Sequence, residues 1–188
     1  DEVHADGELL CLDAKNGTIV WKVAGAWGTL LALSSRHDAL VMSFQPSQYR
    51  LPSERGGRMM VFKASDGTKR WDRQARYSTR PVINDRTVYA QGGAWDLLTG
   101  EDRPFNMSRS YGCGQISSSK SLMVFRSGTL GYFDLTRKAG LENYGGIRLG
   151  CWINAIPVGG LVLVPDGSVC TCSYLNRGSF ALQRVEAE

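Results

Sequence analysis

The sequence predicts an all-β fold built from four-stranded units that repeat along the chain. Three observations predict it: a recurring turn motif, strand–turn–strand patterns between its copies, and a high content of glycine. The 188 residues include 22 glycines, which tolerate the positive φ angles of tight turns. No segment carries apolar residues at the i, i+3, i+4 and i+7 spacing of an amphipathic helix.

The turn motif first occurs in the stretch GELLCLDAKNGTIVWKV, which has the pattern of two strands around a tight turn. Asp13, Gly17 and Trp21 follow one another at intervals of four residues. The stretch VFKASDGTKRW repeats the pattern fifty residues later, with Gly67 and Trp71 at the matching positions. The two stretches are therefore two copies of one structural unit.

Further copies keep only part of the motif. In the second copy Lys63 replaces the Asp. The third copy, AWDLLTGEDRPF, keeps Asp96 and Gly100 but has no Trp after them. The fourth copy, GYFDLTRKAGLENY, keeps Asp134 and has a longer turn, and the last, GSFALQRV, keeps only a strand. The repeat thus weakens toward the end of the sequence.

Hairpin patterns lie between the copies, in LLALSSRHDALVMSF, STRPVINDRTVYAQGG, GQISSSKSLMVFRSG and NAIPVGGLVLVPDG. Four strands repeating every ~40–50 residues are typical of β-propeller blades. Each blade has two apolar faces that stacked neighbours bury, and the recurring Trp can cover the seam between them. We expect one partial propeller domain over 1–188, with blades at approximately 1–24 (outer part), 28–73, 78–106, 113–145 and 151–185.

The number of units is small for a closed ring, and the first unit begins in the middle of a blade. Three arrangements fit: a piece of a longer chain, two copies that close one ring, or a small propeller that joins its first and last strands. We favour part of a larger propeller, with a dimer-closed ring next. The start of the sequence, DEVHADGELL, lacks Met and the pattern of a signal peptide, which fits a mature form or a fragment.

The segment DAKNGTIVW resembles the tryptophan-docking motif of the PQQ-like, quinoprotein-type β-propeller repeats, which are WD40-like in architecture. PVINDRTVYA resembles the hairpin that precedes this motif in the family. The resemblance extends over nearly the whole chain, although Pro104 stands where a docking Trp would follow Gly100. It implies a structural docking role for Asp13, Gly17, Trp21, Gly67, Trp71, Asp96, Gly100 and Asp134, and an exported bacterial protein, periplasmic or secreted.

Cysteines are the most distinctive candidates for chemistry. Cys11 lies within a strand, where we expect a small buried apolar residue. Cys113, Cys151, Cys170 and Cys172 gather in the last part of the chain, and in an exported protein they would form two disulfides of undetermined connectivity. A four-thiolate metal site is the alternative, although the paired Cys-x-x-Cys spacing of zinc sites is missing.

Other residue patterns exclude several functions. The net charge is +4 without a long basic run, which argues against nucleic-acid binding, and no apolar run could span a membrane. His4 and His37 have the pattern of solvated residues at a terminus and in a turn. Motifs of the serine hydrolases, P-loop proteins and zinc proteases do not occur.

The sequence therefore predicts a non-catalytic binding or scaffold module that binds a protein partner or a second copy of itself, with no cofactor. The resemblance implies envelope assembly for related propellers. The alternative is part of a PQQ-dependent alcohol or sugar dehydrogenase, or a degenerate relative, which would bind PQQ with calcium. The adjacent cysteine pair of those alcohol dehydrogenases is missing, because Thr171 separates the last two cysteines. No catalytic residue is assigned.

Overall fold

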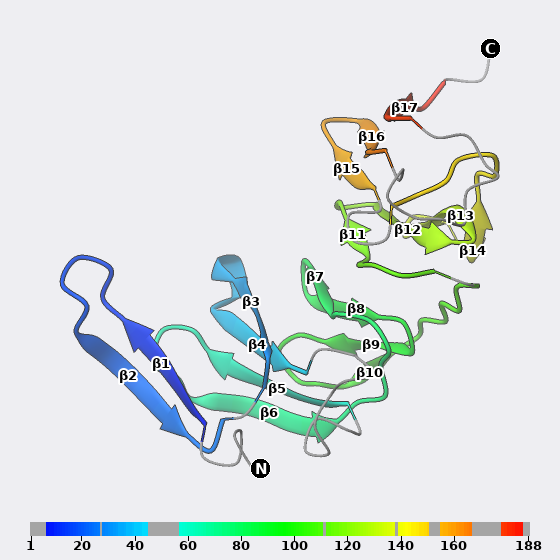
Figure 1. The fold of residues 1–188 in the computed structure, drawn as a ribbon. Coiled ribbons are helices and arrows are strands. Elements are labelled where there is room, and N and C mark those ends of the chain that lie inside the picture. Colours follow the sequence, from blue (N-terminus) through cyan, green and yellow to red (C-terminus); the bar gives the residue numbers. More distant parts are fainter. Residues whose placement is uncertain are drawn as a thin grey trace, which may run out of the picture. The chain divides into compact units, whose positions relative to one another are not determined.

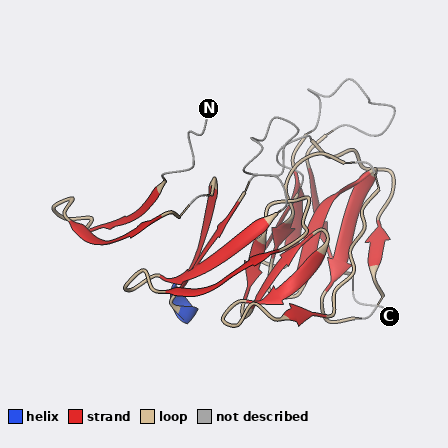
Figure 2. Cartoon of the chain, turned by 90° about the horizontal axis from the view of Figure 1, so that it is seen from below, coloured by secondary structure: helices blue, strands red, loops and turns tan. Residues whose placement is uncertain are grey.

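The computed structural model describes residues 7–26, 28–44, 57–110, 112–137, 139–150, 155–166 and 178–185. The chain divides into two compact units, residues 1–105 and 106–188, and each is described by itself. Almost every regular element in the described ranges is a β-strand (Figure 2), and the exception is a single turn of 3-10 helix, Ser35–His37. The predicted all-β fold is confirmed.

The first unit holds three antiparallel sheets in which each strand pairs with the next along the chain (Figure 1). The first sheet has two strands, β1 (Glu8–Leu12) and β2 (Ile19–Ala24). The second sheet consists of β3 (Leu30–Ser34), β4 (Ala39–Ser43), β5 (Arg58–Lys63) and β6 (Lys69–Gln74). The third consists of β7 (Val82–Asn84), β8 (Thr87–Ala90), β9 (Gly93–Asp96) and β10 (Asp102–Arg103).

The second unit holds two sheets of the same kind. The fourth sheet consists of β11 (Ser117–Ser118), β12 (Leu122–Ser127), β13 (Thr129–Asp134) and β14 (Leu141–Asn143). The fifth has β15 (Ile156–Val158), β16 (Leu161–Val164) and β17 (Phe180–Gln183). The sheets follow one another in the order of the predicted blades; that they form one domain stays a prediction.

The repeat extends to the register of the strands. Cys11 faces Trp21 across β1 and β2, and the register shifts at the next residue. Val61 faces Trp71 across β5 and β6, and the register shifts there at the same place. Such a shift marks a bulge, which adds a residue to one strand and increases the local twist. The bulge is therefore a feature of the repeated unit, placed directly before the Trp.

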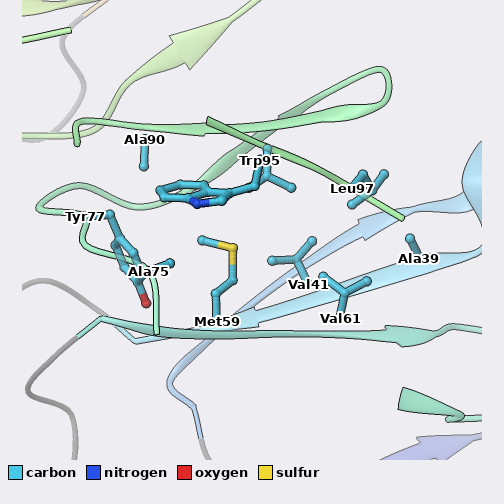
Figure 3. Packing of buried hydrophobic residues seen from close by; sticks show 10 residues of the cluster. Ala39, Val41, Met59, Val61, Ala75, Tyr77, Ala90, Trp95 and Leu97 are labelled. Atoms are coloured by element: carbon cyan, nitrogen blue, oxygen red, sulfur yellow. The ribbon is translucent and has the colours of Figure 1, made fainter. Parts of the chain in front are cut away.

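Apolar side chains fill the spaces between neighbouring sheets of the first unit. Leu9, Met60 and Phe62 belong to a cluster between the first and second sheets. A larger cluster joins the second and third sheets, where Trp95 lies over Met59 (Figure 3). Alternate residues of β5 thus pack against opposite neighbours, as the two-residue period of a strand requires. In the second unit, Val124, Leu130, Leu149, Ala155 and Val164 are among the buried residues of a further cluster.

Two single-residue expectations need correction. His37 is not a solvated turn residue: its side chain is 19% exposed, and Nε2 lies 3.1 Å from Asp85 Oδ1. This contact joins the β3–β4 turn to the β7–β8 turn, so the imidazole has a polar partner in the next sheet. Cys11 is half-buried rather than buried, because it stands on a two-stranded sheet with a neighbour on one face only.

Candidate docking surface

The glycine of the turn motif has the same backbone geometry in three copies. Its N–H donates to the carbonyl four residues earlier, from Gly17 to Asp13 at 2.8 Å, from Gly67 to Lys63 at 3.0 Å and from Gly100 to Asp96 at 2.9 Å. The φ angles of the three glycines are 72°, 75° and 74°. Because the turn is closed by backbone groups, the Asp at its start can be replaced without losing the turn. A side chain at the glycine would be strained.

Carboxylates hold the start of the turn. Asp13 Oδ1 accepts a hydrogen bond from the Lys15 N–H at 2.7 Å, and Asp134 Oδ1 accepts from the Thr136 N–H at 2.8 Å. In the second copy, which has Lys63 at this position, Asp38 of the β3–β4 turn accepts from the Ser65 N–H at 2.7 Å. A carboxylate from a neighbouring loop thus accepts the hydrogen bond that an Asp at the start of this turn would accept.

Asp96 is the most enclosed of these carboxylates. It is 5% exposed and accepts hydrogen bonds from the N–H groups of Leu98 and Thr99, at 2.8 and 3.0 Å. Burial alone would raise the pKa of Asp96. The hydrogen bonds from Arg103 and from the two N–H groups, with the positive charge of Arg86, outweigh burial and lower the pKa to about 2. Asp96 is therefore ionised and serves the structure of the turn.

Each Trp of the motif lies on the glycine of the next copy. The Trp21 indole N–H donates to the Ala64 carbonyl at 3.0 Å, and a β-carbon at Gly67 would lie 2.7 Å from the Trp21 ring. Trp71 donates to the Leu97 carbonyl at 2.9 Å, and a β-carbon at Gly100 would lie 2.8 Å from its ring. The glycine therefore gives the indole a flat surface, and the carbonyl three residues before it orients the ring.

This pairing resolves why Gly100 is kept although no Trp follows it in its own copy. The glycine receives the Trp of the preceding sheet, and the Trp of its own copy would serve the following one. The sequence alignment placed Gly and Trp correctly within each copy but did not link them between copies. The accepting carbonyls of Ala64 and Leu97 were missed, since a backbone acceptor leaves no mark on residue type.

One apolar patch of the first unit is covered by none of the described sheets. Leu10, Leu12, Ile19 and Val20, on β1 and β2, are 45%, 54%, 57% and 57% exposed. We call these four residues the β1–β2 patch. Their counterparts on β5, fifty residues later, are Met60 and Phe62 for the two leucines, which are 2% and 1% exposed. The same strand positions are thus covered on the second sheet and open on the first.

A small groove of about 110 Å³ lies where the first and second sheets meet, lined in part by Val23, Ala26 and Met60. Its polar wall is an ion pair in which Arg58 Nε and Nη2 donate to the two Asp72 oxygens at 2.7 and 2.6 Å. The hydrogen bonds from Arg58 lower the pKa of Asp72, against the effect of burial. A paired, bidentate carboxylate of this kind ties β5 to β6 and leaves little basicity for proton transfer.

Buried arginines distinguish the second unit. Arg126 is fully buried and Arg148 is 4% exposed. Burial lowers the pKa of Arg109, Cys113 acts in the opposite direction, and the charge of Arg126 lowers it further. The Arg109 guanidinium donates to the Gly114 carbonyl at 3.3 Å. Arg126 and Arg148 thus belong to the interior of the second unit, and the half-buried Arg109 lies near Cys113 and Arg126.

The predicted cysteine pairs stay a prediction. Within the described ranges Cys11 and Cys113 carry free thiols, and Cys113 is exposed. Cys151, Cys170 and Cys172 lie outside the described residues. In the part of the chain that the structure describes, no three residues among His, Cys, Asp and Glu come together as metal ligands would. No helix among those residues has the length and hydropathy that crossing a membrane requires.

Comparison with known proteins gives the fold. No protein-family model and no curated protein matches the sequence. Among solved structures, BamB from Moraxella catarrhalis aligns over 86% of this chain and 50% of its own, with 17% identity and a TM-score of 0.50. The computationally designed protein Ika8 aligns over 85% and 50%, with 15% identity and a TM-score of 0.56.

A second designed protein, Ika4, is matched over nearly its whole length. It aligns over 92% of this chain and 95% of its own, with 13% identity and a TM-score of 0.55. This chain therefore has the β-propeller fold. It spans about half the length of BamB and of Ika8.

Proposed function

We propose that this chain is a non-catalytic β-propeller module that binds a protein partner within an exported bacterial protein. The carrying observation is the β1–β2 patch, whose counterparts Met60 and Phe62 are covered by a neighbouring sheet. Contiguous exposed apolar residues of this kind mark surfaces for other proteins. The proposal places the protein in the periplasm or outside the cell.

We further propose that the repeats are of the PQQ-like type. The support is the double occurrence of one arrangement: Trp21 on Gly67 and Trp71 on Gly100, each with its indole N–H on a backbone carbonyl. The proposal does not extend to quinone chemistry. The carboxylates described above bind turn amides and arginines, and Asp72, which lines the groove, is paired with Arg58.

The proposal is tested with the full chain immobilised and exposed to an envelope extract. Proteins retained in stoichiometric amount are identified, purified and bound again in isolation. The test variant replaces Leu12, Ile19 and Val20 by Lys. The matched control replaces Leu31 and Leu33 by Lys, which are exposed strand residues of β3, 57% and 63% exposed.

We expect one purified partner to rebind the natural chain and the control variant but not the variant of the β1–β2 patch. Equal rebinding to all three chains, or rebinding lost only in the control, would contradict the proposal that the patch is the binding surface. Failure of any protein to rebind would contradict a binding function altogether.

A further inference from the structure

Two arginines share one carboxylate at the end of the third sheet. Arg86 Nε and Arg103 Nη2 both donate to Asp96 Oδ2, at 3.1 and 2.6 Å. Asp96 is buried, whereas the side chains of Arg86 and Arg103 are 50% and 40% exposed. The carboxylate thus fixes both guanidinium groups from the protein side, and both side chains remain open to solvent.

The turn itself does not require this pair of arginines. In the second copy the same turn closes with Lys63 in place of the Asp, through the bond from the Gly67 N–H to the Lys63 carbonyl. In the fourth copy the charges are reversed, because Arg137 binds both Asp134 and Glu142, at 2.9 and 3.3 Å. Among the described copies, two cations on one carboxylate therefore occur only in the third.

Most hydrogen-bond donors of the two arginines are left over. A guanidinium carries five N–H donors, and each of these two directs one nitrogen at Asp96. No other residue that the structure describes accepts a hydrogen bond from Arg86 or Arg103. Because the fork of a guanidinium matches the two oxygens of a carboxylate, a second carboxylate can bind across the pair from the solvent side.

The β7–β8 turn brings a third arginine to the same end of the sheets. Asp85 precedes Arg86 in this turn and binds Arg36 of the β3–β4 turn, whose Nη1 lies 3.3 Å from Asp85 Oδ1. The same oxygen lies 3.1 Å from His37 Nε2, and the Arg36 side chain is 81% exposed. Asp85 is thus shared by two basic side chains, as Asp96 is, so its charge is already offset from the side of the second sheet.

Two acidic residues precede Arg103 in the chain. Asp102 is engaged elsewhere, since its Oδ1 lies 3.2 Å from Arg73 Nη2. Glu101 is exposed and forms no ion pair with a residue in the described ranges. Glu101 is therefore available to compete with a ligand for Arg103.

We infer that Arg86 and Arg103 form a docking position for a carboxylate side chain from an acidic segment of a partner protein. This inference rests on the proposed binding function and names a second surface for it, apart from the β1–β2 patch. The incoming carboxylate would accept N–H groups from both guanidiniums, and Arg36 would bind a further acidic residue of the segment. Asp85 and Asp96 stand between the arginines and repel a continuous polyanion, whereas separate acidic side chains can alternate with them.

The probe is a capped hexapeptide of alternating Ser and Glu, and its matched control has Gln in place of each Glu. The isotope-labelled full chain is titrated with each peptide and followed by NMR at low ionic strength, because salt screens exposed charges. The side-chain Nε–H signals of Arg86 and Arg103 report directly on the contact. We expect the Glu peptide to shift both signals and the Gln peptide to bind about tenfold more weakly.

Variants of the chain locate the contact. Arg103→Gln should weaken binding of the Glu peptide about tenfold, and Arg103→Lys about threefold, because Lys keeps the charge but lacks the fork. Glu101→Gln leaves the arginine pair intact and should strengthen binding about twofold, since it removes the competing carboxylate. It keeps the test decisive if Arg103→Gln disturbs the turn around Asp96.

Arg137→Gln is the matched control variant, because the Arg137 side chain is 57% exposed and is likewise paired with carboxylates. It should change the affinity for the Glu peptide by no more than about twofold. Unshifted signals of Arg86 and Arg103, equal binding of the two peptides, or an equal loss of affinity with Arg137→Gln would each overturn the inference.

Inorganic phosphate provides the remaining arm. If phosphate binds the arginine pair more tightly than the Glu peptide does, the position serves a small oxyanion and the assignment to a protein segment is wrong. Binding of the Glu peptide in preference to phosphate supports the assignment. The variants of the β1–β2 patch retain Arg86 and Arg103, so a failure of this inference and a failure of the proposed binding function can be told apart.

Discussion

Gly67 and Gly17 stand at the same position of the same turn, fifty residues apart, yet one is buried and the other exposed. Both have positive φ, and both N–H groups bind the carbonyl four residues earlier. The difference is the sheet that lies against Gly67 and brings Trp21 with it. The turn is therefore a local product of its own sequence, and the docked Trp is a property of the neighbour. The contact between two blades is therefore made by the stacking of neighbouring sheets, whereas the turn forms without it.

The largest effect is expected from removing a docked indole. Trp71→Ala should lower the free energy of unfolding by about 3 kcal/mol, because the ring contacts Gly100 and its N–H satisfies the Leu97 carbonyl. Trp71→Phe keeps most of the ring and should cost about 1 kcal/mol. Urea unfolding followed by circular dichroism measures both. If Trp71→Ala cost nothing, the seam would not depend on the indole.

The next comparison is between covered and uncovered residues at matching strand positions. Met60→Ala should cost about 3 kcal/mol, since the side chain is buried between two sheets. Leu10→Ala, at the matching position of β1, should cost less than about 0.5 kcal/mol, because Leu10 is 45% exposed. Thermal unfolding of both variants measures the difference. Equal losses would mean that the β1–β2 patch is covered in solution by something other than a removable partner.

Adding a methyl group to each glycine sharpens the comparison further. Gly17→Ala should cost about 1 kcal/mol, from the strain of positive φ alone. Gly100→Ala should cost about 2–3 kcal/mol, because the methyl group also collides with the Trp71 ring. The free energy of unfolding in urea separates the two. A larger loss at Gly17 than at Gly100 would argue against ring docking.

The covered turn of the third copy should also respond to acid. The folded pKa of Asp96 is about 2, below its ordinary value of 3.8, so its ionisation stabilises the fold above pH ~4. That contribution, about 2 kcal/mol, should be lost as pH falls from about 4 to about 2. Unfolding free energies across this range measure it. Asp96→Asn is the control, and its free energy of unfolding should fall correspondingly less over the same pH range. If the slope of unfolding free energy against pH were the same in this variant, the acid response would not come from Asp96.

Much of the fold could be predicted because local rules govern it. Alternating apolar residues predicted the hairpins. The turn predicted at Asn84–Asp85 lies one residue later, since Asn84 ends β7 and the turn before β8 is Asp85–Arg86. Asp13 and Gly17 could be recognised as a turn because both act through the backbone of their own loop. Information of this kind is present within ten residues of the chain.

Contacts between sheets could not be predicted in the same way. That Trp21 belongs with Gly67, and not with Gly17, depends on how two units of the repeat stack. Two further contacts likewise join loops that are distant in the sequence. One is between His37 and Asp85, and the other is from Asp38 to the turn that has Lys63 in place of Asp. The type of a single residue does not indicate which distant residue it will contact, because such contacts depend on how the sheets pack. The predicted cysteine pairs are of the same kind and need a chemical test.

The most direct test of the account is a double-mutant cycle at one occupied seam. Gly100→Ala is measured alone and in the Trp71→Ala background, and Gly17→Ala is measured in the same two backgrounds. The account predicts that removing the Trp71 ring reduces the loss of unfolding free energy caused by Gly100→Ala by about 1–2 kcal/mol. The remaining loss should equal that of Gly17→Ala. The loss caused by Gly17→Ala itself should differ between the two backgrounds by no more than about 0.5 kcal/mol. Additive costs at Gly100 would contradict it, because the glycine and the indole of the preceding copy would then not be in contact.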